Sequence, residues 1–316
     1  MTSALLLAAG RGTRLDPLTR LVAKPAVPLG NRTLVEHVIA WLKAQGIGDV
    51  VVNLHHLPET ITRVLGDGAH LGIPVRYSWE REILGSAGGP RRALPLLGSD
   101  PFVIVNGDTL CDFDLAPMIE AHRASGAAVT LAVVPNQHTA HYNGVLLDDH
   151  DAVTGFIPRG HSEPSWHFVG VQVVSRRVFE PLDDGVPAES VAGIYRDLLT
   201  SEPGSIRGWR VTTSFVDVGT PRDYLAAVLR QPDSLPAGLA VPESSSLTRC
   251  AVWPEATIEE NVRLEDCIVA GPVSVPGGLE ARAAIIVPLD VVRPDDRVRV
   301  QRDVAIYSLD LPPGRV

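Results

Sequence analysis

The chain has 316 residues, of which 45% are apolar and 21% charged, and its formal net charge is −9. This length predicts about two domains, and the apolar fraction excludes a disordered chain. No apolar run approaches the length of a membrane span, and we recognise no leader-like segment, so we expect a cytoplasmic protein that does not bind membranes. Acidic residues outnumber basic ones, which argues against nucleic-acid binding.

The first 110 residues alternate between strand and helix signals. Strands are predicted at residues 3–8, 49–54, 75–78 and 102–105, and helices at 32–45, 59–65 and 86–97. Such alternation is typical of a parallel sheet covered by helices. We therefore expect a doubly wound, Rossmann-like α/β fold for this part of the chain.

The middle of the chain mixes both types of element and ends in a linker-like segment. Strands are predicted near 127–134, 145–147, 167–175 and 210–216, and helices near 189–200 and 221–230. Residues 233–246 are rich in Pro, Ser and Gly, as linkers are. The predicted domains are therefore 1–232 and 247–316.

A six-residue period follows the linker. One series of apolar or small residues consists of Val252, Ile258, Leu264 and Ala270, and a second of Ala256, Val262 and Ile268. This period predicts a short left-handed parallel β-helix, in which one such residue per flat face points inward. Two ordinary β-hairpins are the alternative.

The loop after the first predicted strand contains Gly10, Arg11, Gly12 and Arg14. In open α/β sheets, ligands bind beyond the carboxyl ends of the strands. Glycines there let main-chain N–H groups approach phosphate oxygens, and arginines supply positive charge. Glycine-rich turns also occur for backbone reasons alone, so the loop by itself is weak evidence for a phosphate site.

The longer stretch from Leu7 to Leu29, with the segment Ala-Lys-Pro at 23–25, resembles the N-terminal motif of the sugar-1-phosphate nucleotidylyltransferases. The resemblance implies a GT-A-like nucleotidyltransferase fold. It also implies that Lys24 reaches the phosphates in the active site. The nucleotide would be held by the loop, with the nucleoside at Ala8, Ala9 and Gly10 and the triphosphate at Gly12, Thr13 and Arg14.

The chemistry of nucleotidyl transfer suits these residues. Two anionic reactants must meet, and charge that develops on the leaving pyrophosphate must be offset. Arg14 can fork across two phosphate oxygens, whereas Lys24 is a compact point charge. All but two of the 28 basic residues are arginine, and Lys24 and Lys43 are the exceptions. Outside this motif, a lysine before a Pro-rich turn would be interpreted as a solvated surface residue, and this is the alternative for Lys24.

Two aspartates follow predicted strands. Asp108 ends the sequence Asn-Gly-Asp after an apolar strand, and Asp217 begins Asp-Val-Gly-Thr-Pro, in which Thr220 could cap a helix that has Pro221 in its first turn. Mg²⁺ takes one or two carboxylates together with phosphate oxygens. In the resembled family both segments supply a metal-binding aspartate, although an aspartate after glycine is often only a turn residue.

Recognition of the base is expected from the turn that begins at Gly85 and Ser86. In related enzymes a polar residue five positions before this small-residue turn reads the base, and Glu80 has that position here. A carboxylate only accepts hydrogen bonds, which suits the two adjacent donors of guanine. Uracil and thymine also offer one donor, Glu82 competes for the role, and an exposed surface glutamate is the alternative.

Recognition of the sugar is expected from Gly144 and Gly170, whose surroundings resemble family segments that face the hexose. The family often has Glu-Lys-Pro near residues 156–160, with its lysine on the sugar phosphate. This chain has Ile-Pro-Arg there, so Arg159 is the candidate substitute.

We therefore expect a Mg²⁺-dependent enzyme that makes an NDP-sugar from an NTP and a sugar 1-phosphate, with GTP and mannose 1-phosphate as leading substrates. Uridylyl or thymidylyl transfer to glucose 1-phosphate or another sugar 1-phosphate is the alternative. A non-catalytic regulatory subunit that binds nucleotide-sugar is the alternative from another class. The C-terminal domain could mediate a homo-oligomer.

Overall fold

The computed structural model describes residues 1–213 and 215–310. The chain forms two compact units. We call Met1–Gly10, Glu36–Pro58 and Leu65–Phe215 the sheet unit, and Arg11–Val35, Glu59–Val64 and Val216–Val316 the coil unit. The segment of residues 11–35, which carries most of the N-terminal motif and is called the signature segment below, thus groups with the C-terminal residues. The compact units do not divide at the boundary expected near residue 232.

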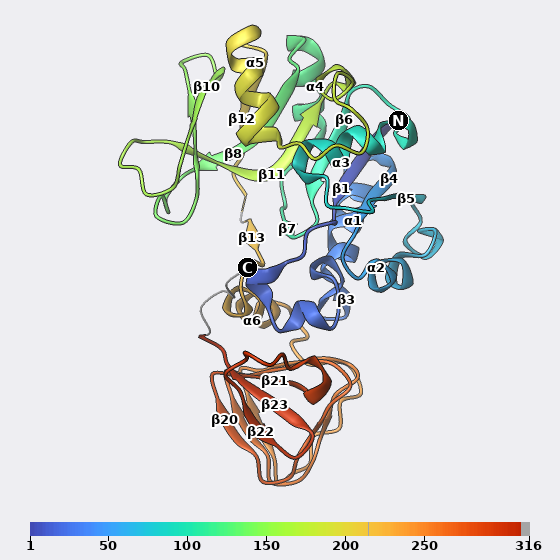
Figure 1. The fold of residues 1–316 in the computed structure, drawn as a ribbon, viewed down its shortest axis with the longest axis vertical. Helices are drawn as coiled ribbons and strands as arrows, with labels where there is room; N and C mark the ends of the chain where they lie inside the picture. Colours follow the sequence, from blue (N-terminus) through green and yellow to red (C-terminus); the bar gives the residue numbers. More distant parts are fainter. Residues whose placement is uncertain (214, 311–316) are drawn as a thin grey trace. The chain divides into compact units, whose positions relative to one another are not determined.

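The sheet unit is built on one mixed nine-stranded sheet with the order β10-β9-β11-β6-β1-β4-β5, while β8 pairs with β11 and β12 (Figure 1). Its strands are β1 (Thr2–Leu7), β4 (Ile47–Leu54), β5 (Val75–Trp79), β6 (Phe102–Asn106), β8 (Val129–Pro135), β9 (Gly144–Leu147), β10 (Val153–Ile157), β11 (Trp166–Val174) and β12 (Ile206–Arg210). β4, β5 and β6 run parallel to their neighbours on the β1 side, as the strand–helix alternation predicted. β11 runs antiparallel to β6, which makes the sheet mixed.

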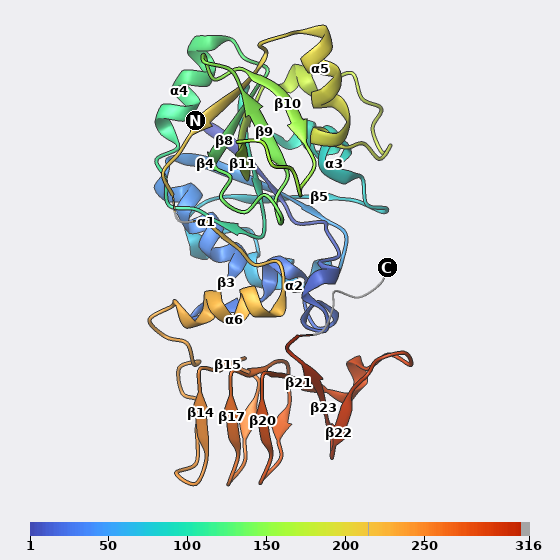
Figure 2. The ribbon, with the colours of Figure 1, turned by 90° about the vertical axis from the view of Figure 1, so that its left-hand side faces the viewer.

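Helices cover both faces of this sheet. They include α1 (Leu34–Ala44), α3 (Gly85–Ala93), α4 (Ala116–Ser125) and α5 (Tyr195–Ser201). Figure 2 shows α4 on one side of the sheet and α3 and α5 on the other. The strands between them are apolar on both faces, as expected of a sheet covered by helices. Among the described helices, none is both long enough and apolar enough to cross a membrane.

Three elements of the sheet unit differ from the sequence prediction. The strand predicted at 210–216 is replaced by β12, which ends at Arg210; residue 214 lies outside the described residues. β10 was missed because Gly155 and a register shift interrupt its alternation. α4 was missed because it is short and buries only Met118, Ile119 and His122, which gives too little helical periodicity.

The coil unit contains three stacks of parallel strands. The stacks are β14 (Ser246–Thr248), β17 (Arg263–Glu265) and β20 (Glu280–Arg282); β15 (Ala251–Val252), β18 (Ile268–Val269) and β21 (Ala284–Pro288); and β16 (Thr257–Ile258) and β19 (Ser274–Val275). Figure 2 shows the first stack side by side. Ser246 pairs with Arg263, which pairs with Glu280, so successive coils are offset by 17 residues.

This parallel pairing differs from that of β-hairpins and is consistent with a short β-helix. The residues of both predicted six-residue series are buried, and most of them form one apolar core inside the coils. The last coil strand, β21, pairs antiparallel with β23 (Val304–Ser308), which pairs antiparallel with β22 (Arg299–Gln301). The stack therefore ends in a C-terminal hairpin.

The signature segment packs inside the coil unit. It contains the short strands β2 (Pro28–Leu29) and β3 (Arg32–Thr33), and three single 3-10 turns, Thr13–Leu15, Leu18–Arg20 and Lys24–Ala26. The remaining α-helices and β-strands of the described residues are α2 (Pro58–Leu65), β7 (Thr109–Leu110), β13 (Val216–Asp217) and α6 (Pro221–Leu229).

Helix α6 holds the signature segment to the coils. The Tyr224 hydroxyl donates to the carbonyl of Pro28 at 2.7 Å and accepts from Nε1 of Trp253 at 2.9 Å. α6 begins as predicted, because the Thr220 side chain accepts a hydrogen bond from the N–H of Asp223 and Pro221 occupies the first turn. The Asp223 carboxylate accepts from the N–H of Thr220 in return, which completes a capping box.

Candidate active site

Gly12 gives the signature segment a tight turn over Lys24. Its φ is +63°, and a Cβ added there would lie 2.9 Å from Cγ2 of Thr19 and 3.0 Å from Cβ of Lys24. Any other residue would be strained in backbone conformation and would push these side chains apart. Thr13, the next residue, is exposed and begins the first 3-10 turn. The glycine therefore fixes how closely the loop lies against the lysine.

Lys24 is buried, with 7% of its surface exposed. Its Nζ lies 3.9 Å from Oδ1 of Asp217, whose side chain is 25% exposed. A buried ammonium group needs an anionic partner to offset its desolvation, and Asp217 is in place to provide it. The second lysine, Lys43, is exposed, and its Nζ donates to the carbonyl of Leu71. The two lysines of the chain thus stand in opposite environments.

The Gly219 backbone lies where three charged side chains of the coil unit converge. A Cβ added there would lie 3.2 Å from Nη1 of Arg14, 3.3 Å from Oδ2 of Asp223 and 3.4 Å from Oδ2 of Asp217. Three residues predicted from sequence, Arg14, Lys24 and Asp217, are therefore brought together within one compact unit. Asp223 was not predicted for the site; the Thr-Pro-x-Asp pattern of its capping box was the available signal.

The segment predicted to hold the nucleoside, Ala8 to Gly10, lies in the sheet unit. Ala8 and Ala9 are buried and Gly10 is exposed. The N–H of Ala8 donates to Oδ1 of Asn53 at 2.6 Å, so it is engaged inside the protein. Asn53 was missed by the sequence analysis, although a polar residue near the end of an otherwise apolar strand was a usable signal.

Glu80 continues this buried chain of hydrogen bonds. Its Oε1 accepts from Nδ2 of Asn53 at 2.7 Å, and its Oε2 accepts from the N–H of Leu84 at 2.9 Å. Glu80 is only 5% exposed, so it is not a solvated surface glutamate. Both carboxylate oxygens thus link the ends of β4 and β5 to the start of α3. Base recognition by Glu80 stays a prediction.

The small-residue turn at Gly85 is packed against residues 186–190. Gly85 has φ +76°, and its Cβ would lie 2.6 Å from the carbonyl oxygen of Ala188. The Ser86 hydroxyl donates to Oε2 of Glu189 at 2.6 Å and accepts from the N–H of Ser190 at 2.8 Å. Close approach of two backbones therefore accounts for Gly85. Roles of Gly85 and Ser86 toward a nucleotide stay predictions.

Asp108 and Gly170 lie on neighbouring parts of the sheet. Asp108 directly follows Gly107 at the end of β6, and the N–H of Gly107 donates to the carbonyl of Leu7. Gly170 lies in β11, beside β6, with φ +84°; its Cβ would lie 2.7 Å from Nδ2 of Asn106. Gly170, predicted for the sugar, therefore lies against Asn106, which is two residues before Asp108 and which the sequence analysis did not select. Asp108 belongs to the sheet unit and Asp217 to the coil unit.

The other predicted sugar residues lie on the β9–β10 side of the sheet. A Cβ on Gly144 would lie 2.7 Å from Oγ of Ser165 and 2.8 Å from Nε2 of His161. Arg159 is exposed, and its N–H donates to Oδ1 of Asn143, the residue before Gly144. The two candidates are thus joined through one asparagine.

An aromatic cluster beside Gly144 was missed by the sequence analysis. The ring centroids of Tyr142 and His167 are 4.0 Å apart, and that of Phe215 is 5.1 Å from His167 and 5.9 Å from Tyr142. Burial lowers the pKa of His167 to about 4, so this imidazole is neutral near pH 7. The cluster offers an uncharged aromatic surface. Its residues come from three separate segments, and no local pattern unites them.

The acidic residues fit a metal that is shared with a substrate. Among the residues that the structure describes, no three His, Cys, Asp or Glu side chains gather in a cluster that could hold an ion. Mg²⁺ commonly binds through one or two carboxylates plus phosphate oxygens, without a protein cage. Asp217, a partly exposed carboxylate near two basic residues, matches that donor set.

Comparison with known proteins gives consistent results. Residues 3–233 match the family model described as Nucleotidyl transferase. The mannose-1-phosphate guanylyltransferase of Mycobacterium tuberculosis is 30% identical over 223 residues, which cover 70% of this chain and 62% of that protein. The UTP–glucose-1-phosphate uridylyltransferase of Synechocystis sp. is 29% identical over 243 residues, 71% of this chain and 62% of that protein. The chain thus spans less than two thirds of either relative.

A shorter relative is matched over nearly its whole length. The D-glycero-α-D-manno-heptose 1-phosphate guanylyltransferase of Aneurinibacillus thermoaerophilus is 31% identical over 230 residues, which cover 71% of this chain and 96% of that protein. The crystal structure of HddC from Yersinia pseudotuberculosis superposes with a TM-score of 0.63 at 23% identity, covering 72% of this chain and 98% of HddC. This structural likeness shows a shared fold.

Proposed function

Because this chain belongs to the nucleotidyl transferase family, we propose that it transfers a nucleotidyl group from a nucleoside triphosphate to a sugar 1-phosphate. The observation that carries the proposal is the buried Lys24, which lies 3.9 Å from Asp217 with Arg14 beside the same aspartate. A buried lysine at a glycine turn, with an exposed arginine near its aspartate partner, supplies positive charge for polyanionic substrates. The named activities of the relatives support the same reaction class.

In the proposed reaction, an oxygen of the sugar 1-phosphate attacks the α-phosphorus of the triphosphate. A new P–O bond forms, the bond between the α-phosphorus and the bridging oxygen breaks, and pyrophosphate leaves with that electron pair. The exposed guanidinium of Arg14 can form two parallel hydrogen bonds to phosphate oxygens. The ammonium of Lys24 offsets negative charge, and its burial makes that interaction stronger than in water.

The acidic residues have the complementary role of holding a divalent cation. We assign Mg²⁺ to Asp217 and Asp108, of which Asp217 also sets the position of Lys24. When bound, Mg²⁺ would neutralise charge on the phosphates. Asp217 keeps a partly exposed carboxylate for this purpose, and the Thr220–Asp223 capping box fixes the turn that presents it.

For the substrates, we propose GTP and mannose 1-phosphate. Two of the three relatives described above are named as guanylyltransferases, one of them for mannose 1-phosphate. The relative from Synechocystis sp. is named for UTP and glucose 1-phosphate, and it supports the second candidate pair. A non-catalytic subunit that binds nucleotide-sugar is disfavoured. Such a subunit would not need a full set of residues for nucleotidyl transfer, whereas this chain has Arg14, Lys24, Asp108 and Asp217.

The test combines each of ATP, GTP, UTP, CTP and dTTP with several hexose 1-phosphates in the presence of Mg²⁺, and it measures the release of pyrophosphate. We expect release with at least one pair and the highest kcat/KM with GTP and mannose 1-phosphate. Release that is highest with UTP and glucose 1-phosphate would replace the substrate assignment. No release with any pair, from protein that binds an NDP-sugar, would establish the regulatory alternative.

A further inference from the structure

Arg20 lies between Gly12 and Lys24 in the signature segment, and its guanidinium is bound by residues 291–307, the segment that follows β21 and continues into the C-terminal hairpin. Nη1 donates to the carbonyl of Val291 at 3.0 Å and approaches the Tyr307 hydroxyl at 3.3 Å. Both terminal nitrogens also bond the Asp296 carboxylate, with Nη2 3.1 Å from Oδ1. The Arg20 and Asp296 side chains are only 11% and 15% exposed, although 276 residues separate them.

The same guanidinium is also bonded to Asp16, in the loop of residues 10–16, which is called the triphosphate loop below. Nε and Nη2 of Arg20 donate to Oδ2 of Asp16 at 3.1 and 3.0 Å. The other oxygen of Asp16 accepts from the Thr19 hydroxyl at 3.1 Å, and that hydroxyl also lies 3.2 Å from the carbonyl oxygen of Gly12. The methyl group of Thr19 is also the atom that lies nearest to a Cβ added at Gly12. An unbroken series of contacts therefore joins Asp296 to the turn over Lys24.

The C-terminal side of this network is also fully bonded. Oδ2 of Asp296 accepts from the N–H of Arg293 at 2.7 Å and from the Tyr307 hydroxyl at 2.6 Å. The hydrogen bond from Arg20 holds the pKa of Asp296 well below its ordinary value, so the carboxylate remains charged at any physiological pH. Loss of one partner from a buried charge pair leaves the other charge uncompensated. The positions of the Arg20 guanidinium and the Asp296 carboxylate thus depend on each other.

We propose that Asp296 and Tyr307 are positioning residues for the triphosphate loop, acting through Arg20, Asp16 and Thr19 to hold the turn at Gly12 in the geometry that binds a nucleoside triphosphate. The inference rests on the proposed function for the identity of the ligand. It makes residues 291–307 a part of the nucleotide site, whereas a segment that only ended the coil stack would have no effect on that site.

The test compares three full-length variants with the wild type. Asp296→Asn removes the charge at nearly constant volume, and Tyr307→Phe removes one hydroxyl. Asp310→Asn is the matched control, because it breaks the exposed ion pair between Arg222 and Asp310 in the same C-terminal region. The measurements are hydrogen–deuterium exchange of the peptide that spans residues 11–24, GTP and UTP binding by calorimetry, and thermal unfolding.

We expect Asp296→Asn to exchange faster in residues 11–24 and to bind the preferred triphosphate at least fivefold more weakly, with a smaller change for Tyr307→Phe and none for Asp310→Asn. In turnover assays, the KM for the triphosphate should rise more than the KM for the sugar phosphate. If Asp296→Asn does not fold, Tyr307→Phe carries the test.

Unchanged loop exchange, or faster exchange with unchanged triphosphate affinity at a temperature where the variant is folded, would overturn the inference. A wild type that binds neither triphosphate would overturn it as well. If the wild type binds triphosphate with this dependence on Asp296 but releases no pyrophosphate, then the proposed function fails and the positioning role stands.

Discussion

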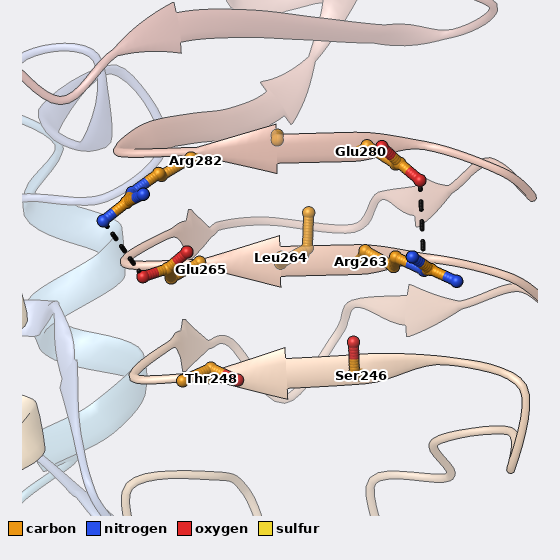
Figure 3. Close-up of a pocket in the computed structure, with 8 residues that line it drawn as sticks. Ser246, Thr248, Arg263, Leu264, Glu265, Glu280 and Arg282 are labelled. Carbon is orange, nitrogen blue, oxygen red and sulfur yellow. Dashed lines mark ion pairs between the residues drawn. The ribbon is translucent and has the colours of Figure 1, made fainter.

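The signature segment and the outer face of the β14–β17–β20 stack lie in one compact unit and use the same charged residue types, yet they differ in burial. On the outer face, Arg263 and Glu280 are 3.9 Å apart with side chains 73% and 71% exposed, and Arg282 pairs with Glu265 at 3.2 Å (Figure 3). In the signature segment, the Arg20 side chain is 11% exposed and bonds two carboxylates at once.

The difference separates two uses of charge. Exposed ion pairs contribute about 0–1 kcal/mol, because water and salt screen them and long side chains lose entropy. Buried charges are costly unless every partner is in place, so they fix positions closely. The Arg–Glu pairs of the outer face therefore give a charged sheet surface, whereas the signature segment has charges in fixed positions, as the proposed phosphate site requires.

The largest effect is expected at Lys24. Replacing it by alanine removes the buried ammonium and leaves Asp217 without that partner, so kcat/KM for pyrophosphate release should fall about 100-fold or more, which corresponds to ~2.7 kcal/mol. Lys43→Ala is the matched control and should retain wild-type kinetics. Equal losses in the two variants would remove the distinction between buried and exposed lysines.

The next largest effect is expected at the two aspartates that are proposed to hold Mg²⁺. Asp217→Asn and Asp108→Asn should each lower kcat at least tenfold and raise the Mg²⁺ concentration needed for half-maximal rate, because an amide binds the cation more weakly than a carboxylate. A chelator should abolish the wild-type activity, and added Mg²⁺ should restore it. A variant with normal kcat and normal Mg²⁺ dependence would exclude that aspartate from the site.

Gly12→Ala should have an intermediate effect. The substitution forces φ +63° on a residue with a Cβ and pushes against Thr19 and Lys24, so we expect a loss of ~1–2 kcal/mol in unfolding free energy together with weaker triphosphate binding. Gly46→Ala is the control: its φ is +77°, but no described atom lies within 4 Å of the added Cβ. Gly46→Ala should therefore lose a similar amount of unfolding free energy but bind triphosphate with wild-type affinity. Normal triphosphate affinity in Gly12→Ala would show that the tight turn is unimportant for binding.

The smallest effect is expected on the outer face of the coils. Glu280→Gln breaks the exposed pair with Arg263 and should change the unfolding free energy by less than ~0.5 kcal/mol, with no change in pyrophosphate release. Chemical denaturation at low and high salt measures this. A loss above ~1.5 kcal/mol would mean that this exposed ion pair contributes more to stability than screened surface pairs do.

Much of the architecture could be predicted because its signals are local. Alternating apolar strands and helices indicated the β1–β4–β5–β6 part of the sheet, the Thr-Pro pair indicated the start of α6, and the six-residue period indicated which coil residues are buried. Arg14, Lys24 and Asp217 could be selected as a set because the resemblance to a known family joined motifs that lie far apart in the chain.

The remaining features depend on contacts that leave no local pattern. The buried bonds of Glu80 to Asn53 and Leu84 come from strand ends that only the folded sheet brings together. The grouping of the signature segment with the C-terminal residues depends on pairs such as Arg20 and Asp296. Arg20 and Asp296 are residue types that usually lie on the surface. The sequence alone therefore could not distinguish them from the arginines and glutamates that form exposed ion pairs on the coils.

The role of Lys24 is tested most directly by the rate of pyrophosphate release by Lys24→Arg, measured beside Lys43→Arg with the best substrate pair and saturating Mg²⁺. Both substitutions keep the positive charge, but a planar guanidinium does not fit the buried space of a compact ammonium. We expect at least a tenfold loss for Lys24→Arg and no loss for Lys43→Arg. Wild-type release by Lys24→Arg would contradict the claim that this buried lysine is a point charge at the phosphates.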